Sequence, residues 1–159
     1  MPTDPAILRQ AMRFWTTGVT IVTATANNVS HGMTVSSFTS VSLEPPQILI
    51  SLAQNTRTHD LVEKSRMFGV TILSIGQEEI SNRFAGRVPD ELDRLAGLET
   101  FTLVSGAPLL RNGLAWLDCH VVSTIVSGLH TLFIAEVLAA QSAPTGAPLV
   151  YFNQGYTKI

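Results

Sequence analysis

The chain has 159 residues, a net charge of −2 and one cysteine, Cys119. This length predicts a single domain spanning residues 1–159, and a lone cysteine rules out an intrachain disulfide, as expected for a reducing compartment such as the cytoplasm. The ten lysines and arginines are scattered, and no apolar run approaches the roughly 18 residues of a membrane span, so neither nucleic acid nor a membrane is an expected partner.

The order of elements follows from capping residues, turn residues and the period of the apolar positions. The first half predicts, in chain order, a helix at residues 3–15, strands at 19–25 and 32–43 joined by a turn at Asn27-Asn28, a break at Pro45-Pro46, and a strand at 47–52. The second half predicts a helix at 58–65, a strand at 67–73, helices at 77–85 and 90–96, strands at 113–126 and 130–139, and a last strand at 149–152. About seven strands joined mainly by short turns indicate a mainly β fold, a β-barrel with helical decorations, rather than a doubly wound parallel sheet.

Charged residues are scarce in this chain. They make up 14% of the residues, whereas typical soluble domains have about 25%. Large apolar patches rarely stay exposed, so we expect the chain to bury surface against a second copy of itself. A compact apolar monomer is the alternative.

The stretch GMTVSSFTSVSL, residues 32–43, places many hydroxyls in a predicted strand. It is either an edge strand whose hydroxyls face water or a support along which a ligand lies. In the second case the small side chains, including Gly32, would let the backbone approach a flat ring. Residues 55–58 have the sequence Asn-Thr-Arg-Thr and lie between a predicted strand and a predicted helix. Free N–H groups at a helix start bind anions, and Arg57 could add a contact to a phosphate.

Several other kinds of site find no support in the sequence. There is no GxGxxG after a strand, no GxxxxGK[ST] and no GxSxG, so the Rossmann, P-loop and nucleophile-elbow motifs are missing. The four histidines have neither paired spacing nor cysteine companions, so no metal site is expected.

Several ordered motifs together carry a family resemblance. They are GMTVSSFTSVSLEPPQILISL, NTRTHDLVEKSRMFGVTIL, ISNRFAG, GAPLL, WLDC, GLHTLFIAEV and PLVYF. In this order and over nearly the whole chain, the sequence resembles the flavin reductase family, the small reductase components of two-component flavin-dependent monooxygenases. The resemblance implies an FMN-binding split β-barrel and a homodimer. It also implies reduction of FMN or FAD by NADH or NADPH, with the reduced flavin passed to a separate monooxygenase.

The resemblance also implies, position by position, which residues contact the cofactors. For the flavin they are Thr34, Val35, Ser36, Ser37, Ser51, Leu52, Ala53, Thr56, Arg57, Thr58, Arg83, Phe84, Ala85 and Gly86. His130 would lie near the nicotinamide, and Tyr151 and Phe152 would approach the dinucleotide.

One residue departs from the family pattern. The family usually has Gly-Asp-His at the position where this chain has Gly128-Leu129-His130, so no carboxylate is available there to orient the imidazole. Two alternatives to a reductase stay open from the sequence. One is a split-barrel flavoprotein that binds FMN without diffusible reductase activity, and the other is a non-enzymatic dimeric barrel that serves as an interaction module.

Overall fold

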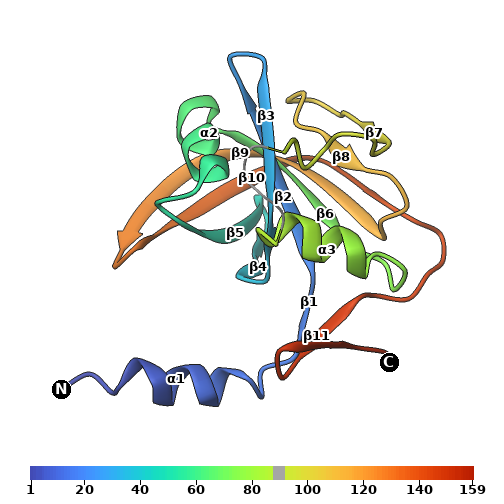
Figure 1. Cartoon of the computed structure of the whole chain (residues 1–159). Helices are drawn as coiled ribbons and strands as arrows, with labels where there is room; N and C mark the ends of the chain where they lie inside the picture. Colours follow the sequence, from blue (N-terminus) through green and yellow to red (C-terminus); the bar gives the residue numbers. More distant parts are fainter. Residues whose placement is uncertain (88–91) are drawn as a thin grey trace.

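A computed structural model describes residues 1–87 and 92–159 and has a curled, seven-stranded sheet at its centre (Figure 1). The strand order is β3-β2-β6-β9-β10-β5-β4, and all neighbouring pairs are antiparallel. The strands are β2 (Thr20–Ala26), β3 (Val29–Val35), β4 (Phe38–Leu43), β5 (Pro46–Ala53), β6 (Met67–Ile72), β9 (Ala115–Ser127) and β10 (His130–Ser142). This confirms the mainly β, antiparallel prediction.

The two edges of this sheet are joined by the chain itself. β3 and β4 lie at opposite ends of the strand order, yet only Ser36 and Ser37 separate them. The backbone N–H of Ser51 on β5 donates to the carbonyl of Ser37 at 3.0 Å. The crossing segment therefore closes the curled sheet into a barrel.

This crossing corrects the expectation of one strand over residues 32–43. Ser36 and Ser37 leave the ladder, because the chain must turn from one edge of the barrel to the other. The expected proline break is a hairpin turn, in which Leu43 pairs with Pro46, the first residue of β5. A proline is tolerated there because the first residue of a strand need not donate to the ladder.

Within the described residues, three helices lie outside the barrel: α1 (Pro5–Met12), α2 (Arg57–Ser65) and α3 (Glu78–Phe84). Asp4 caps α1, as expected, by accepting from the N–H of Ala6 at 2.7 Å. The helix predicted at 90–96 lies partly outside the described residues, and residues 92–97 form a bend and a turn instead. No helix within the described ranges is long and apolar enough to cross a bilayer.

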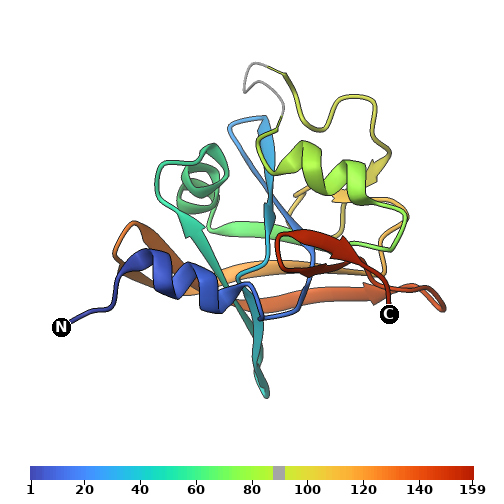
Figure 2. The ribbon, with the colours of Figure 1, turned by 60° about the horizontal axis from the view of Figure 1, so that its bottom comes forward.

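Short strands complete the molecule. β1 (Thr17–Gly18), β11 (Val150–Phe152) and β12 (Gly155–Thr157) form one small sheet, while β7 (Thr100–Phe101) pairs with β8 (Leu109–Leu110). The strands β1, β7, β8 and β12 are too short to show a period, so the sequence did not predict them. In Figure 2, α1 and the C-terminal strands lie on the same side of the barrel.

Most of the described buried apolar residues form two clusters. The first fills the barrel and draws on six of its strands and on α2; among its fully buried side chains are Ile50, Phe68 and Phe133. The second lies beneath α3 and includes Ile21 and Phe84. The N-terminal half of β2 therefore contributes to both clusters.

The β9–β10 hairpin extends past the first cluster. Its strands turn at Ser127–Leu129, where Gly128 has a φ of +57°. The alternation predicted along β9 ends near a register shift, because Val121 and Ser123 face adjacent residues of β10. Ile125, expected on the buried face with Cys119, is exposed instead.

Candidate functional site

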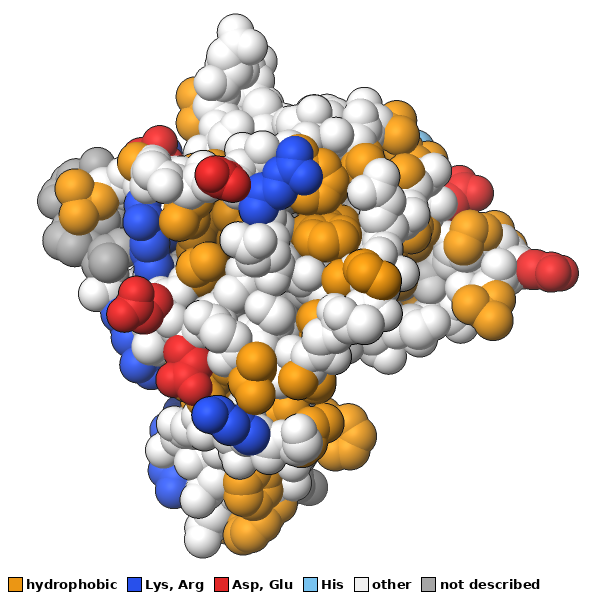
Figure 3. Space-filling model, turned by 90° about the vertical axis from the view of Figure 1, so that its right-hand side faces the viewer, with side chains coloured by type: hydrophobic (Ala, Val, Ile, Leu, Met, Phe, Trp, Pro, Cys, Tyr) orange, Lys and Arg blue, Asp and Glu red, His pale blue; other side chains and the backbone are white. Residues whose placement is uncertain are grey.

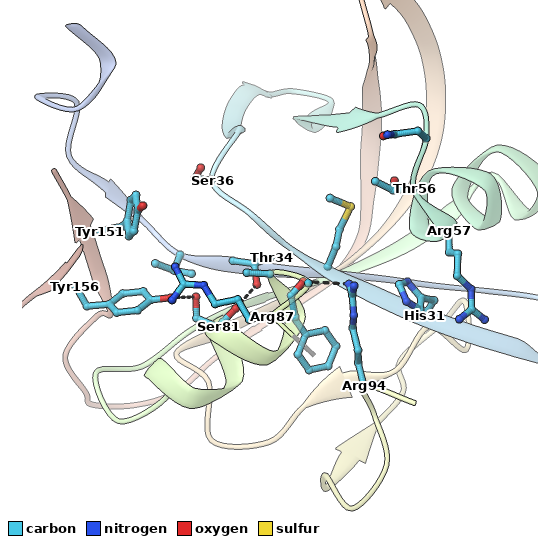
Figure 4. A pocket seen from close by; sticks show the side chains of 16 residues that line it. His31, Thr34, Ser36, Thr56, Arg57, Ser81, Arg87, Arg94, Tyr151 and Tyr156 are labelled. Carbon is cyan, nitrogen blue, oxygen red and sulfur yellow. Dashed lines mark hydrogen bonds between the residues drawn. The ribbon is translucent and has the colours of Figure 1, made fainter. Parts of the chain in front are cut away.

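A cavity of about 510 Å³ runs along β3, between the start of α2 and the C-terminal strands (Figure 4). Its described wall consists of Val19, His31, Met33, Thr34, Ser36, Asn55, Thr56, Arg57, Ser81, Phe84, Ala85, Gly86, Arg87, Arg94, Tyr151 and Tyr156. Thr56, Arg57 and His31 lie at one end, and Tyr151 and Tyr156 at the other. The cavity therefore joins a helix start to a pair of aromatic rings.

The α2 end of the cavity is built by a capping threonine. The hydroxyl of Thr56 accepts from the N–H of His59 at 3.3 Å and donates to the carbonyl of Ala53 at 2.8 Å. These bonds hold the first turn of α2 against the end of β5, with Arg57 as the first helical residue. The N–H groups at a helix start carry partial positive charge, so this end suits an anionic group.

Thr58 serves this end of the cavity indirectly. It is fully buried, and its hydroxyl is 2.8 Å from Nδ1 of His31. His31 in turn lies in the cavity wall. Thr58 thus fixes the imidazole and does not face the cavity itself.

Arginines from the α3 side add positive charge. Arg94 is buried, and its Nη1 donates to the carbonyls of Gly32 at 3.0 Å and Phe84 at 3.1 Å. Arg87 also lines the cavity. The described wall thus contains three arginines, counting Arg57, and no carboxylate, which favours a ligand that carries phosphate.

Arg83, expected beside the flavin, contacts the turn that follows α3. Its Nη2 donates to the carbonyl of Ala96 at 2.7 Å and to that of Asp93 at 3.1 Å. It therefore ties the end of α3 to the turn that carries Arg94. Arg83 supports the cavity without being part of its wall.

The other end of the cavity is fixed by hydroxyl groups. Tyr156 donates to Oγ of Ser81 at 2.7 Å, and its ring meets the ring of Tyr151 edge to face, with 5.7 Å between centroids. The hydroxyl of Thr34 donates to the carbonyl of Ser81 at 2.7 Å. These bonds attach α3 to β3 and to the C-terminal strands.

The structure gathers about half of the residues expected at the flavin or the dinucleotide. Those in the cavity wall are Thr34, Ser36, Thr56, Arg57, Phe84, Ala85, Gly86 and Tyr151. Those outside it are Val35, Ser37, Ser51, Leu52, Ala53, Thr58, Arg83, His130 and Phe152. Val35 and Leu52 are part of the barrel core, so only their backbone groups could face a ligand.

His130 lies outside the cavity wall, at the end of β5 between the start of α2 and the crossing at Ser36 and Ser37. It opens β10, is exposed, and pairs with Ala53 of β5. Gln54 follows and donates from its backbone to the carbonyl of Leu129 at 3.0 Å. Ala53 is two residues from Ser51 along β5. Its partner His130 is therefore near the hydrogen bond between Ser51 and Ser37.

Sequence reasoning missed several residues of the wall, including His31, Met33, Arg87, Arg94 and Tyr156. Two of these residues could have been identified from the sequence. Alternation along β3 places His31 and Met33 on one face. Arg94 had no such signal, because its partner on β3, Gly32, is far away in the sequence.

Nucleophilic and metal chemistry find little support in the described residues. Burial, reinforced by the neighbouring Asp118 carboxylate, raises the pKa of the Cys119 thiol to about 12, so the thiol stays protonated. No group of three or more histidine, cysteine, aspartate or glutamate side chains within the described ranges is placed to hold a metal ion.

Comparison with known proteins gives one consistent result. A family model described as "Flavin reductase like domain" matches residues 12–159. The chain is 40% identical over 156 residues to the NADH-dependent flavin reductase StyB of Pseudomonas fluorescens, covering 96% of this chain and 89% of that protein. It is 38% identical over 152 residues to the reductase component of a 4-nitrophenol monooxygenase from Rhodococcus opacus, covering 96% and 80% respectively.

Solved structures agree with the fold. The NADH:FAD oxidoreductase SgcE6 of Streptomyces globisporus superposes with a TM-score of 0.92 at 32% identity, covering 100% of this chain and 95% of that one. The styrene monooxygenase flavin reductase of Pseudomonas putida S12 gives a TM-score of 0.85 at 36% identity, with 96% of each chain covered.

Proposed function

Since the chain belongs to the flavin reductase family, we propose that it transfers a hydride from NADH to a flavin, FMN or FAD, and supplies the reduced flavin to a separate monooxygenase. The observation that carries the proposal is the cavity along β3, in which the start of α2 with Arg57 lies at the opposite end from Tyr151 and Tyr156. A flavin has the matching layout, with phosphate at one end and a flat ring at the other.

The residues present fit a flavin. The N–H groups at the start of α2, together with Arg57, would hold the phosphate. Ser36 and Thr34 also line the cavity (Figure 4) and would lie along the ribityl chain and ring. Their small side chains would allow the ring to lie close to the crossing segment between β3 and β4.

The flavin and the nicotinamide together supply the hydride transfer, and the protein supplies position and electrostatics. Reduction places negative charge on the flavin ring system, which backbone N–H groups of the lining segments would stabilise. The two rings must stack with the reacting atoms about 3–3.5 Å apart. This chemistry needs no catalytic triad and no carboxylate pair.

His130 is proposed to position the nicotinamide. It is exposed and pairs with Ala53 of β5, two residues along that strand from Ser51, which bonds to Ser37. With Leu129 in place of the usual acidic residue, no neighbouring carboxylate of that motif holds the imidazole. We propose that His130 contacts the donor without acting as an obligatory acid, and that Phe152 and Tyr151 approach the same dinucleotide.

We propose that the chain acts as a homodimer. The β9–β10 hairpin exposes Val122, Ile125, Val126 and Leu129, and α1 buries none of its own residues. Figure 3 shows further hydrophobic side chains on the barrel and on the lobe below it, where α1 and β11 lie. A second copy covering such surface would explain the low share of charged residues.

Two further proposals concern the whole chain. Residues 1–159 are proposed to act as one domain, since β1 near the start pairs with β11 near the end. The cytoplasm is the proposed location, because the single cysteine is buried and protonated and NADH is the donor proposed here.

The test is a matrix of NADH or NADPH against FMN, FAD and riboflavin, followed by absorbance of the nicotinamide. We expect steady NADH oxidation that rises with added free flavin. A yellow protein whose NADH oxidation does not respond to free flavin would instead be a flavoprotein without diffusible reductase activity. A colourless protein whose Tm no flavin raises would be an interaction module.

A further inference from the structure

A second cavity, of about 480 Å³, lies between α1 and the β4 edge of the barrel. Its described wall consists of Arg9, Met12, Arg13, Trp15, Thr17, Ser36, Ser37, Phe38, Thr39, Leu49, Tyr151, Asn153 and Gln154. Ser36 and Tyr151 belong to the walls of both cavities. The second cavity therefore begins where the ring end of the first one stops.

The C-terminal end of α1 is fixed beside this cavity. The carbonyl of Arg13 accepts from the N–H of Asn153 at 3.0 Å, at the turn between β11 and β12. Shortly after α1, Thr17 pairs with Tyr151. Arg9 and Arg13 are four residues apart, so they lie one above the other on the same face of the helix. The anchored helix thus holds two guanidinium groups at one wall.

The chemical character of this wall is specific. It combines the two arginines with three aromatic side chains, Trp15, Phe38 and Tyr151, and the described lining contains no carboxylate. Arginine binds phosphate through paired N–H donors, and aromatic faces stack on flat rings. The wall therefore suits a ligand that carries both phosphate and a base.

Strand β5 connects this cavity to the residue that pairs with His130. Leu49, Ser51 and Ala53 alternate onto one face of β5, and His130 pairs with Ala53. Leu49 lines the second cavity. Four residues of a strand span about 13 Å, so a dinucleotide whose nicotinamide lies near Ala53 and His130 could reach this cavity with its other half.

We propose that the second cavity binds the diphosphate and adenosine of the nicotinamide dinucleotide, with Arg9 and Arg13 contacting the phosphates and one of the aromatic rings stacking on the adenine. This assignment rests on the proposed function for the identity of the donor. It adds Arg9 and Arg13 to the donor site. Neither arginine belongs to the family motifs found in the sequence.

The test is the double variant Arg9→Ala/Arg13→Ala, with Lys64→Ala/Arg111→Ala as the matched control. Lys64 and Arg111 are exposed and belong to neither cavity wall. Calorimetry with ADP-ribose on the flavin-free protein measures binding of the distal half of the donor alone. Steady-state kinetics then compare NADH with reduced nicotinamide riboside, which lacks the phosphates and the adenosine.

We expect the double variant to bind ADP-ribose roughly tenfold or more weakly and to raise KM for NADH by a similar factor, because two charge-assisted contacts are lost. KM for reduced nicotinamide riboside and the Kd for FMN should stay within twofold. The control should match the wild type for every ligand. The difference for NADH should shrink at high salt, since the arginines are exposed.

Unchanged ADP-ribose binding and unchanged KM for NADH in the double variant would overturn the assignment. Equal losses for NADH and for reduced nicotinamide riboside would also overturn it. Weaker binding of FAD but not of FMN, with KM for NADH unchanged, would instead assign the cavity to the adenylate of FAD. If neither donor reduced flavin with the wild type, the proposed function would fail, while ADP-ribose calorimetry would still decide what the cavity binds.

Discussion

At the scale of single residues, Arg57 offers the most direct test of the flavin orientation. It opens α2 and lines the first cavity. Arg57→Ala should raise the Kd for FMN about tenfold, since a hydrogen bond to a charged group contributes about 1.5–3 kcal/mol. Riboflavin, which has no phosphate, should bind nearly as before. Fluorescence titration measures both, with Lys64→Ala in the last turn of α2 as the control. Equal losses for the two ligands would contradict a phosphate contact.

His130 tests the donor side at the same scale. His130→Ala should raise KM for NADH several-fold and leave the Kd for FMN unchanged, because the side chain is exposed and outside the flavin cavity. His120→Ala is the matched control, since that histidine is also exposed but pairs with Met67 on the other side of β9. A variant that lost flavin binding while keeping its KM for NADH would show that the role is misassigned.

At the scale of elements, the packing of α3 on β3 decides the shape of the cavity. A Cβ at Gly32 would come within 2.9 Å of both the Phe84 ring and the Thr23 methyl. The missing side chain thus makes room for the Phe84 ring of α3. Gly32→Ala should cost about 1–3 kcal/mol through overpacking and weaken FMN binding, because Phe84 lines the cavity.

The measurements for Gly32→Ala are Tm and the Kd for FMN. A loss of this size corresponds to a fall of several degrees in a domain of this length. Gly18→Ala is the control, because no atom lies within 4 Å of the added Cβ. An unchanged Tm for Gly32→Ala would mean that α3 moves away without a loss of stability. The packing of α3 on β3 would then not determine the shape of the cavity.

The elements differ in how well local sequence signals predict them. Local signals were sufficient for α2, whose cap Thr56 and apolar face are adjacent in the chain, and for the β9–β10 hairpin with its glycine turn. The crossing at Ser36 and Ser37 was missed because its cause is the closure of the barrel, which brings together strands far apart in the sequence. A run of β-branched and hydroxyl residues looks the same whether it continues or bends.

At the scale of the whole molecule, only part of the cavity wall could be predicted, because tertiary contacts bring the other residues to it. Residues such as Thr34 and Arg57 belong to contiguous motifs that the family resemblance identifies. Arg94 enters the cavity only because its guanidinium reaches the carbonyls of Gly32 and Phe84. The contribution of α1 depends on the anchoring of Arg13 by Asn153. Such contacts follow from tertiary packing, which a single sequence does not reveal.

Assembly is the last property of the whole molecule to test. Val126 and Leu129 are 69% and 81% exposed at the tip of the β9–β10 hairpin, so a monomer would leave them in water. If a second copy covers them, Val126→Glu/Leu129→Glu would bury two carboxylates in an apolar contact, which is costly unless they are paired. The double variant should therefore sediment as a monomer at concentrations where the wild type is a dimer. Thr100→Glu, an exposed change on β7, should leave the mass unchanged. A dimer that survives the double variant would place the interface elsewhere, with the unburied face of α1 as the next surface to alter.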